Sequence, residues 1–263
     1  MIKGTLLIRE SDFQCFLANI LYEKKIIDCV IIEKGSSLNS NLKITFKKII
    51  LNLKLLSNFF NLFFKIYQII NYEKFYGNRQ YHNERILGYR KVKLNKNIKV
   101  IKTENINNFK LSNYIKNKKN NFVLVFGTRV IKIKHLRNFK NKFINIHWGY
   151  SPDYRGEGIV TCLAKNDIKK LGVTIHEIGN KIDLGKIIDR KIVKLDSNDN
   201  FYSIGLKMTV AAKNIICDKT FLFKINNSLH TKKKGEIYDS KYIKKNYKDY
   251  YYAFKNLKKL NEK

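Results

Sequence analysis

Two places in the sequence combine residue types that acyl transfer and acid–base chemistry use. Asn145 and His147 end the apolar run FINIH (143–147), and Asp183 follows the run GVTIHEI (172–178), shortly before a turn glycine. Residues two apart on a strand project from one side, so the amide of Asn145 and the imidazole of His147 would lie together. Taken alone, a strand-end His is often structural, and an Asp before a glycine is often a turn former. All three polar groups together favour a shared site.

The segment WGYSPDYRGEG (148–158) predicts a shaped loop beyond the end of that strand. It holds the only Trp and the only Pro of the chain. Pro152 fixes one backbone φ. Three glycines permit conformations that other residues resist: Gly149, Gly156 and Gly158. Loops of this kind frame sites, so we expect this one to lie beside the polar residues.

Short apolar runs separated by helical patterns must position these residues. We predict strands at 4–8, 28–33, 98–102, 122–126, 143–147, 172–178 and 191–195, and crossover helices at 13–25 and 109–119. Continuous rather than alternating hydrophobicity indicates strands covered on both faces, as in parallel sheets. The sequence therefore predicts an α/β fold with a Rossmann-like, mostly parallel sheet and helices on both faces. No G-x-G-x-x-G motif follows the first strand, so a dinucleotide is not indicated. Ligands are expected at the carboxyl ends of the strands.

Three separated motifs carry a resemblance to a known family. They are N-I-H (145–147), Y-S-P-x-Y-R-G (150–156) and G-V-T-I-H-x-I-x-x-x-I-D-x-G-x-I-I (172–188). Together they resemble the folate-dependent formyltransferases that act on glycinamide ribonucleotide, methionyl-tRNA or amino sugars. The resemblance covers roughly 95–195, and 46–95 does not align. It implies the formyltransferase fold, with 46–95 as a helical insertion.

The resemblance also implies the reaction. An amine of the acceptor would attack the formyl carbon of 10-formyltetrahydrofolate through a tetrahedral oxyanion. Asn145 would donate to the oxyanion. His147 would support the oxyanion when protonated and help to move the amine proton. Asp183 would orient His147 and tune its pKa, and no metal is implied.

By the same resemblance, two segments form the walls of the folate site and a third group contacts the acceptor. The folate walls are Phe126, Gly127, Thr128, Arg129, Val130 and Ile131, and Ile178, Gly179, Asn180, Lys181 and Ile182. The acceptor contacts are Trp148, Tyr150, Arg155 and Gly156. Relatives read His-Pro-Ser-Leu-Leu-Pro where this chain reads His-Trp-Gly-Tyr-Ser-Pro, so the acceptor pocket is expected to differ. Arg155 would bind an anionic group of the acceptor or brace the loop, and His176 is expected to be structural.

Composition constrains the partners and the compartment. Lys and Arg number 53 against 21 acidic residues, a net charge of +32, which invites a nucleic-acid or membrane interpretation. Because lysine and asparagine recur throughout the chain, a solvated basic surface is favoured.

Four cysteines without a C-x-x-C pair predict neither a zinc site nor a disulfide framework. The short apolar run at the N-terminus is unlike a secretory signal, so a cytoplasmic protein is expected.

The segments outside the resemblance are predicted to be helical. Residues 46–70 form a helix with a very wide apolar face, and lysines and amides within it argue against a membrane span. A buried insertion is favoured, with homodimerisation or interfacial membrane contact as alternatives. We expect a catalytic domain over 1–200 and a helical extension over 201–263, with one helix at 201–223. A terminal helix after 231 would dock its Tyr and Phe on the domain.

The predicted function is formyl transfer to a small-molecule amine, most simply a nucleotide-linked amino sugar. Methionyl-tRNA formyltransferases carry a further nucleic-acid-binding domain, and too few residues follow Asp196 for one. No stable nucleic-acid partner is therefore expected. Methionyl-tRNA and glycinamide ribonucleotide remain alternative acceptors. A catalytically idle relative that binds RNA or membranes is the alternative from another class.

Overall fold

The computed structural model describes part of the chain. The described residues are 3–34, 77–108, 110, 113–115, 122–132, 142–179, 181–228, 236–238 and 247–261. The predicted helix at 46–70 and Asn180 lie outside them. Most of the predicted helix at 109–119 also lies outside, and residues 110 and 113–115 are helical.

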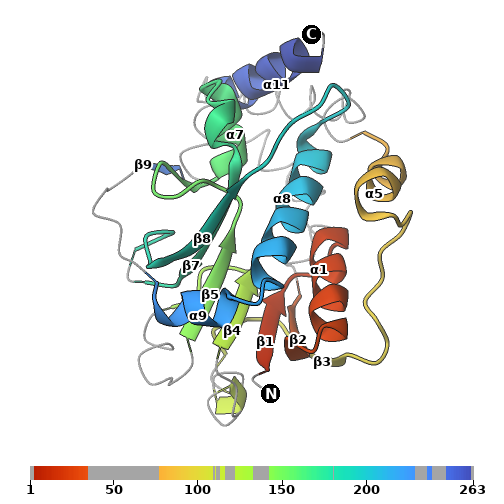
Figure 1. Ribbon diagram of the computed structural model, residues 1–263, viewed down its shortest axis with the longest axis vertical. Coiled ribbons are helices and arrows are strands. Elements are labelled where there is room, and N and C mark those ends of the chain that lie inside the picture. The colour runs from red at the N-terminus through yellow and green to blue at the C-terminus, as the bar shows by residue number, and fades with distance from the viewer. Residues whose placement is uncertain are drawn as a thin grey trace, which may run out of the picture.

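A seven-stranded sheet with the order β3-β2-β1-β4-β5-β7-β8 forms the centre of the molecule (Figure 1). The strands are β1 Gly4–Ile8, β2 Ile27–Glu33, β3 Lys99–Thr103, β4 Phe122–Phe126, β5 Lys142–His147, β7 Gly172–Glu177 and β8 Ile187–Ile192. The first five are parallel to one another, whereas β7 is antiparallel to both β5 and β8. The prediction of a mostly parallel α/β sheet is confirmed. The strand predicted at 191–195 begins instead at Ile187, because this part of the chain pairs with β7.

Two apolar layers cover the sheet, which explains the unbroken apolar runs. Leu6 and Ile8 of β1 face one core and Leu7 faces another. Successive side chains on a strand point to opposite faces, so both parities must be apolar when both faces are covered. Helices α1 (Asp12–Glu23) and α8 (Phe201–Ile216) lie over the first core (Figure 1).

Helix α8 ends earlier than the sequence predicts. Asn200 caps it, with the Asn200 side chain and Ser203 satisfying each other's backbone N–H groups. The prediction of one helix over 201–223 is wrong, since α9 (Phe221–Asn226) is a separate helix. Asp218 accounts for the break: its carboxylate accepts the Thr220 N–H at 2.8 Å, a local bond that competes with helix continuation.

Helix α11 (Tyr247–Asn261) packs on α7 (Gly158–Ala164). Its buried contacts are Ala253 and Leu257, whereas Tyr251 and Tyr252 stay half exposed. Asn256 donates its amide to the carbonyls of the last turn of α7. The predicted terminal helix thus docks on the domain, with Ala253 and Leu257 in the core and Tyr250 packed against it.

The described part of the 46–95 insertion contains helix α5 (Arg79–Leu87), which packs on α8. Arg85 joins the two by ion pairs of 2.8 Å to Asp196 and 2.9 Å to Asp199. The remaining elements are β6 Tyr154–Gly156, the 3₁₀ helix Ile168–Lys170 and β9 Glu236–Tyr238, and β6 pairs with β9. No helix among the described residues is long and apolar enough to cross a bilayer.

Candidate active site

The pairing of β5 with β7 places four polar side chains on one face of the sheet. Asn145 lies opposite His176, and His147 lies opposite Thr174. Directly opposed residues of antiparallel strands project to the same side, and the alternate residues project to the other. Ile144 and Ile146 accordingly belong to the core. The alternation of side chains along β5 therefore places the polar residues on one face of the sheet and the core residues on the other.

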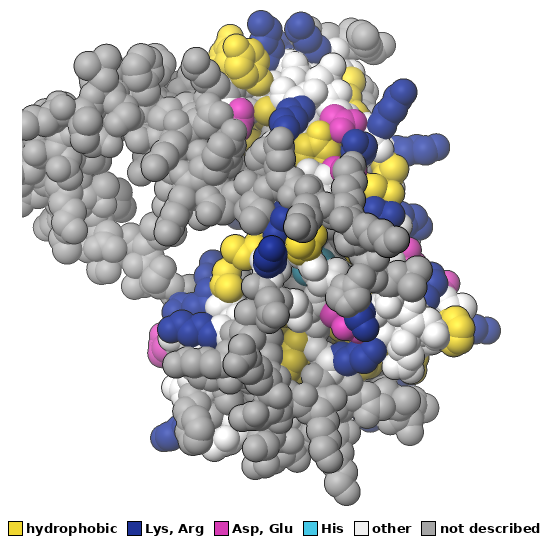
Figure 2. Space-filling view, turned by 90° about the vertical axis from the view of Figure 1, so that its left-hand side faces the viewer, with side chains coloured by type: hydrophobic (Ala, Val, Ile, Leu, Met, Phe, Trp, Pro, Cys, Tyr) yellow, Lys and Arg dark blue, Asp and Glu magenta, His cyan; other side chains and the backbone are white. Residues whose placement is uncertain are grey.

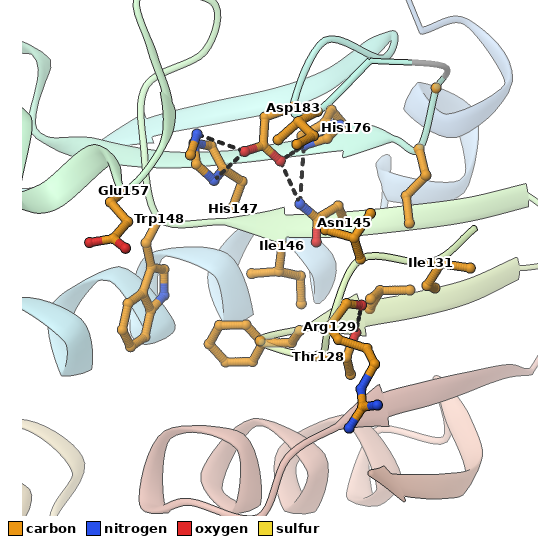
Figure 3. A pocket seen from close by; sticks show the side chains of 18 of the residues that line it. Thr128, Arg129, Ile131, Asn145, Ile146, His147, Trp148, Glu157, His176 and Asp183 are labelled. Carbon is orange, nitrogen blue, oxygen red and sulfur yellow. Dashed lines mark hydrogen bonds and ion pairs between the residues drawn. The ribbon is translucent and has the colours of Figure 1, made fainter. Parts of the chain in front are cut away.

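Asp183 reaches these side chains from the loop between β7 and β8 (Figure 3). Its carboxylate accepts the Asn145 Nδ2 hydrogen at 3.1 Å and the Gly156 N–H at 2.8 Å. Its Oδ2 lies 3.4 Å from His147 Nδ1. Asp183 has a φ of 48°, a left-handed conformation that non-glycine residues rarely adopt and that clusters at functional sites. The three side chains singled out in the sequence thus meet.

His147 is buried and held at both ring nitrogens. Nε2 lies 2.9 Å from the Tyr154 carbonyl oxygen, which only accepts, so Nε2 carries a hydrogen. Nδ1 then faces Asp183 and is the nitrogen that can take a proton. Burial lowers the pKa of His147, and the neighbouring Asp183 opposes that effect without reversing it. The lowered pKa favours the neutral ring at neutral pH, the form that can accept a proton.

For Asp183, unlike His147, the neighbouring groups outweigh the effect of burial on the pKa. Its burial by itself raises the pKa of the carboxyl group, but His147, His176 and the Gly156 N–H favour the ionised form more strongly, so the pKa of Asp183 is lowered. The site therefore contains an ionised carboxylate beside a neutral imidazole.

His176 contacts the same cluster, which the sequence analysis missed. Its Nδ1 lies 2.8 Å from the Glu177 carbonyl, so in the neutral ring Nε2 has the free lone pair. Nε2 is 3.3 Å from Asn145 Nδ2 and 3.4 Å from Asp183 Oδ1. The alternation of Thr174 and His176 in β7 was the available signal, but its use required knowing that β7 pairs with β5.

The 148–156 loop is fastened by buried polar contacts. Thr174 Oγ1 donates to the Gly149 carbonyl at 2.7 Å and accepts the Ser151 N–H at 2.9 Å. Gly149 must be glycine, since a Cβ there would lie 2.3 Å from His147 Nε2. The Ser151–Pro152 peptide bond is cis. The loop is thus joined to the same strand that presents His176.

We expect Thr174→Val to lower the free energy of unfolding by about 1–3 kcal/mol, because buried backbone groups of Gly149 and Ser151 lose a partner. Urea unfolding followed by circular dichroism measures this. Thr209→Val is the matched control, since the Thr209 hydroxyl is also buried but donates to the Gly205 carbonyl within α8. Equal losses in the two variants would contradict the proposed fastening role.

A cavity of about 650 Å³ opens beside the cluster. Of the residues predicted for the folate walls, those that line it are Phe126, Gly127, Thr128, Arg129, Val130, Ile131, Ile178, Gly179, Lys181 and Ile182. Asn145, His147 and Asp183 line it as well. Gly127 has a φ of 67°, and a Cβ there would lie 2.5 Å from Gln14 Nε2. A bare backbone is therefore required at this wall.

The predicted acceptor contacts divide into two groups. Trp148 and Gly156 line the cavity. Arg155 is buried and donates from Nε and Nη2 to the Ile182 carbonyl at 2.9 and 2.5 Å, so it braces the two loops against each other. Tyr150 stacks under the Arg190 guanidinium, 4.6 Å from its ring centroid. Neither Arg155 nor Tyr150 is among the lining residues, and both remain acceptor contacts only by prediction.

Further lining residues escaped the sequence analysis, namely Arg9, Gln14 and Glu157. Arg9 and Arg129 both contact the buried Glu33 carboxylate, at 3.7 and 2.7 Å. No His, Cys, Asp or Glu cluster suited to a metal ion occurs among the described residues. On the face shown in Figure 2, the described Lys and Arg side chains lie in several separate groups.

Comparison with known proteins assigns this site to a family. The family model for formyl transferases matches residues 69–220, more than half of the chain, and this range includes Asn145, His147 and Asp183. The chain belongs to the formyl transferase family. The three side chains of this formyl transferase line the same cavity as the two segments predicted to bind folate.

Individual relatives of this formyl transferase share about 30% identity with it over part of the chain. The bifunctional polymyxin resistance protein ArnA of Wigglesworthia glossinidia brevipalpis is 29% identical over 147 residues, which cover 54% of this chain and 22% of that protein. A methionyl-tRNA formyltransferase of Pelagibacter ubique is 30% identical over 96 residues, which cover 36% of this chain and 31% of that protein. The matches therefore span less than a third of either relative.

A solved structure shows the same fold as this formyl transferase. It is an N-formyltransferase from Helicobacter canadensis in complex with folinic acid and dTDP-3-aminofucose. The two have a TM-score of 0.54 and 16% identity, over 97% of this chain and 81% of that one. At this identity the likeness shows a shared fold.

Proposed function

We propose that this formyl transferase carries a formyl group from 10-formyltetrahydrofolate to the amine of a small-molecule acceptor, a nucleotide-linked amino sugar. One observation supports the proposal most directly. An amide and an imidazole from β5 and a carboxylate from the loop after β7 converge on one cavity, and the described residues predicted to bind folate line it.

The cavity suits a reduced folate. Its volume of about 650 Å³ is within the range of small-ligand sites, and its walls combine aliphatic and aromatic side chains with polar and charged ones. The backbone of Gly127 and its neighbours lies bare at one wall, where it can pair with the edge of a pteridine. When bound, 10-formyltetrahydrofolate supplies an activated formyl group whose leaving nitrogen belongs to the folate.

The residues of the cluster have distinct tasks in this proposal. Asn145 Nδ2 has two hydrogens, one on Asp183 and one facing His176. In the donor complex, a formyl oxygen seated beside Asn145 replaces His176 Nε2 as the acceptor of the second hydrogen, so the amide stabilises the negative charge that develops on that oxygen. His147 accepts the proton of the attacking amine at Nδ1, because Nε2 is committed to the Tyr154 carbonyl.

Asp183 makes that proton transfer favourable. Its ionised carboxylate lies 3.4 Å from Nδ1 and stabilises the imidazolium that forms. The Gly156 N–H and Asn145 bind the same carboxylate and fix its orientation. The proton can then pass from His147 to the departing folate nitrogen.

The acceptor is the least constrained part of the proposal. The Helicobacter canadensis relative is in complex with dTDP-3-aminofucose, which supports an amino sugar. A charge of +32 and the Pelagibacter ubique relative keep methionyl-tRNA as a second candidate. The four cysteines are free thiols, which is compatible with a reducing cytoplasm as the place of the reaction.

A panel experiment tests the function. Purified protein is incubated with 10-formyltetrahydrofolate and, separately, with dTDP-3-aminofucose, glycinamide ribonucleotide or methionyl-tRNA, and tetrahydrofolate release is followed. Donor binding is measured independently through the fluorescence of Trp148, the only Trp of the chain, which lines the cavity. Turnover with one acceptor supports the proposal. Absence of donor binding would favour the catalytically idle alternative.

We expect the acid limb of kcat/KM for the donor, measured with saturating acceptor, to have its midpoint below 6.5, the ordinary pKa of histidine. His147 acts in its neutral form, and burial lowers its pKa, so the neutral form persists to lower pH. Asp183 stays ionised over the same range because its pKa is also lowered. Initial rates between about pH 4.5 and pH 8.5 measure the limb. A midpoint above 6.5 would contradict the assignment of the base.

A further inference from the structure

Arg129 and Ile131 mark the folate end of the cavity, and Glu157 lies at the other end beside Trp148, whose ring contacts Phe126 of the folate wall. Figure 3 shows Glu157 and Trp148 on one side of His147 and Asn145, with Arg129 and Ile131 on the other. Resting on the proposed function, we propose that the Glu157 carboxylate binds the acceptor's amine as an ammonium ion, which releases one proton to water before the neutral amine attacks the formyl carbon. In this proposal Tyr250 of the C-terminal helix positions Glu157.

Close backbone packing places Glu157 beside Trp148. Glu157 is the residue before α7, whose first residue is Gly158. A Cβ on Gly158 would lie 2.5 Å from the Gly149 Cα and 2.6 Å from the Trp148 carbonyl oxygen. Only glycine allows the helix to begin this close to the catalytic loop. The start of α7 thus presents Glu157 to the cavity.

Opposite charges mark the two ends. The guanidinium groups of Arg9 and Arg129 share the Glu33 carboxylate at the folate end, which leaves an excess positive charge there. Among the described lining residues, the carboxylates are Asp183 and Glu157. Asp183 accepts hydrogen bonds from Asn145 and Gly156 and faces two imidazoles within the catalytic cluster, whereas Glu157 lies beside Trp148. The anionic groups of the donor and the ammonium group of the acceptor are thereby directed to different ends of the cavity.

Trp148 gives an independent sign of a polar ligand at this end. Its indole Nε1 is buried and has no hydrogen-bond partner among the described residues. Buried N–H groups in native proteins nearly always have a partner, and an oxygen of the acceptor would supply one. Gly205 of α8 makes room for the indole ring, since a Cβ there would lie 2.9 Å from Trp148 Cη2. The indole is therefore held in place with its donor unused.

Tyr250 connects the C-terminal helix to the acceptor end. Its hydroxyl donates to Glu157 Oε2 at 3.2 Å. Asn256, on the same helix, anchors α11 to the far end of α7 through the carbonyls of Leu163 and Ala164. The helix thus has one contact that touches Glu157 and one that serves docking alone.

The test uses Glu157→Gln in the full chain, with the acceptor of the panel that gives the highest kcat/KM. The amide keeps the size of the side chain and removes its charge. We expect KM for the acceptor to rise roughly tenfold to a hundredfold, with little change in donor affinity by Trp148 fluorescence. The ratio of variant to wild-type KM should fall toward one as pH rises through the pKa of the acceptor amine, because a neutral amine has no charge for Glu157 to bind.

Two further variants separate positioning from folding. Tyr250→Phe should raise the acceptor KM about threefold to tenfold. Asn256→Ala removes the contacts of Asn256 with the last turn of α7 and does not touch Glu157. This variant should leave the acceptor KM unchanged. An unchanged acceptor KM in Glu157→Gln would overturn the proposal, as would a KM ratio independent of pH, which indicates recognition of a hydroxyl group. Intact donor binding without turnover on any acceptor in the wild type would instead count against the proposed function.

Discussion

We expect Asp183→Asn to lower kcat/KM for formyl transfer by about 10³–10⁴-fold. The amide matches the carboxylate in shape but has one acceptor oxygen in place of two. It cannot accept from both Asn145 Nδ2 and the Gly156 N–H, which lie 3.1 and 2.8 Å from opposite oxygens of Asp183. It also removes the charge that stabilises a protonated His147. The two effects act on the same step, so the loss should fall mainly on kcat.

Single-turnover rates with saturating donor measure this loss, and Trp148 fluorescence checks that the donor still binds. Asp189→Asn is the matched control, because Asp189 lies on the adjacent strand β8 and pairs with Lys224 at 2.6 Å, away from the cavity lining. Asp189→Asn should retain nearly full activity. An Asp183→Asn enzyme within tenfold of wild type would remove Asp183 from the mechanism.

His147→Asn should lower kcat by about 10²–10⁴-fold. An asparagine amide reaches the position of Nδ1 and remains polar, but it takes up no proton at neutral pH. The acid limb expected below 6.5 should disappear from any residual activity, because the titrating group is gone. Stopped-flow measurement of tetrahydrofolate formation across pH tests both statements.

His176→Gln separates the base from its neighbour. A glutamine oxygen can accept the Asn145 hydrogen that His176 Nε2 accepts, so the amide stays oriented. We expect a loss of about tenfold or less, with the acid limb retained. A loss as large as that of His147→Asn would move the base to His176.

Much of the architecture was predictable because a strand that is buried on both faces has a continuous apolar sequence. Runs such as FVLVF at 122–126 are apolar at both parities, and the structure covers both sides of that strand. The break between α8 and α9 was not predictable from apolar spacing, which continues through it. It depends on the hydrogen bond that the Thr220 N–H donates to the Asp218 carboxylate, a local bond that replaces continuation of the helix.

The site was predictable only where its signal is local. Asn145 and His147 lie two apart on one strand, and Asp183 shortly precedes a turn glycine, so their types and spacing singled them out. His176 and Glu157 belong to the site through contacts between segments. The first depends on which strand pairs with β5, and the second on the approach of α7 to the catalytic loop. Sequence spacing does not contain that information.

The antiparallel joint between β5 and β7 has an evolutionary consequence. A register shift of one residue in β5 would move Asn145 and His147 to the core face of the sheet and Ile144 and Ile146 to the face of the active site. The reaction would then be lost even if the sheet still formed. Indels of even length keep the parity. Lineages of this enzyme should therefore tolerate lengthening of the loops around these strands far better than any odd-numbered insertion within them.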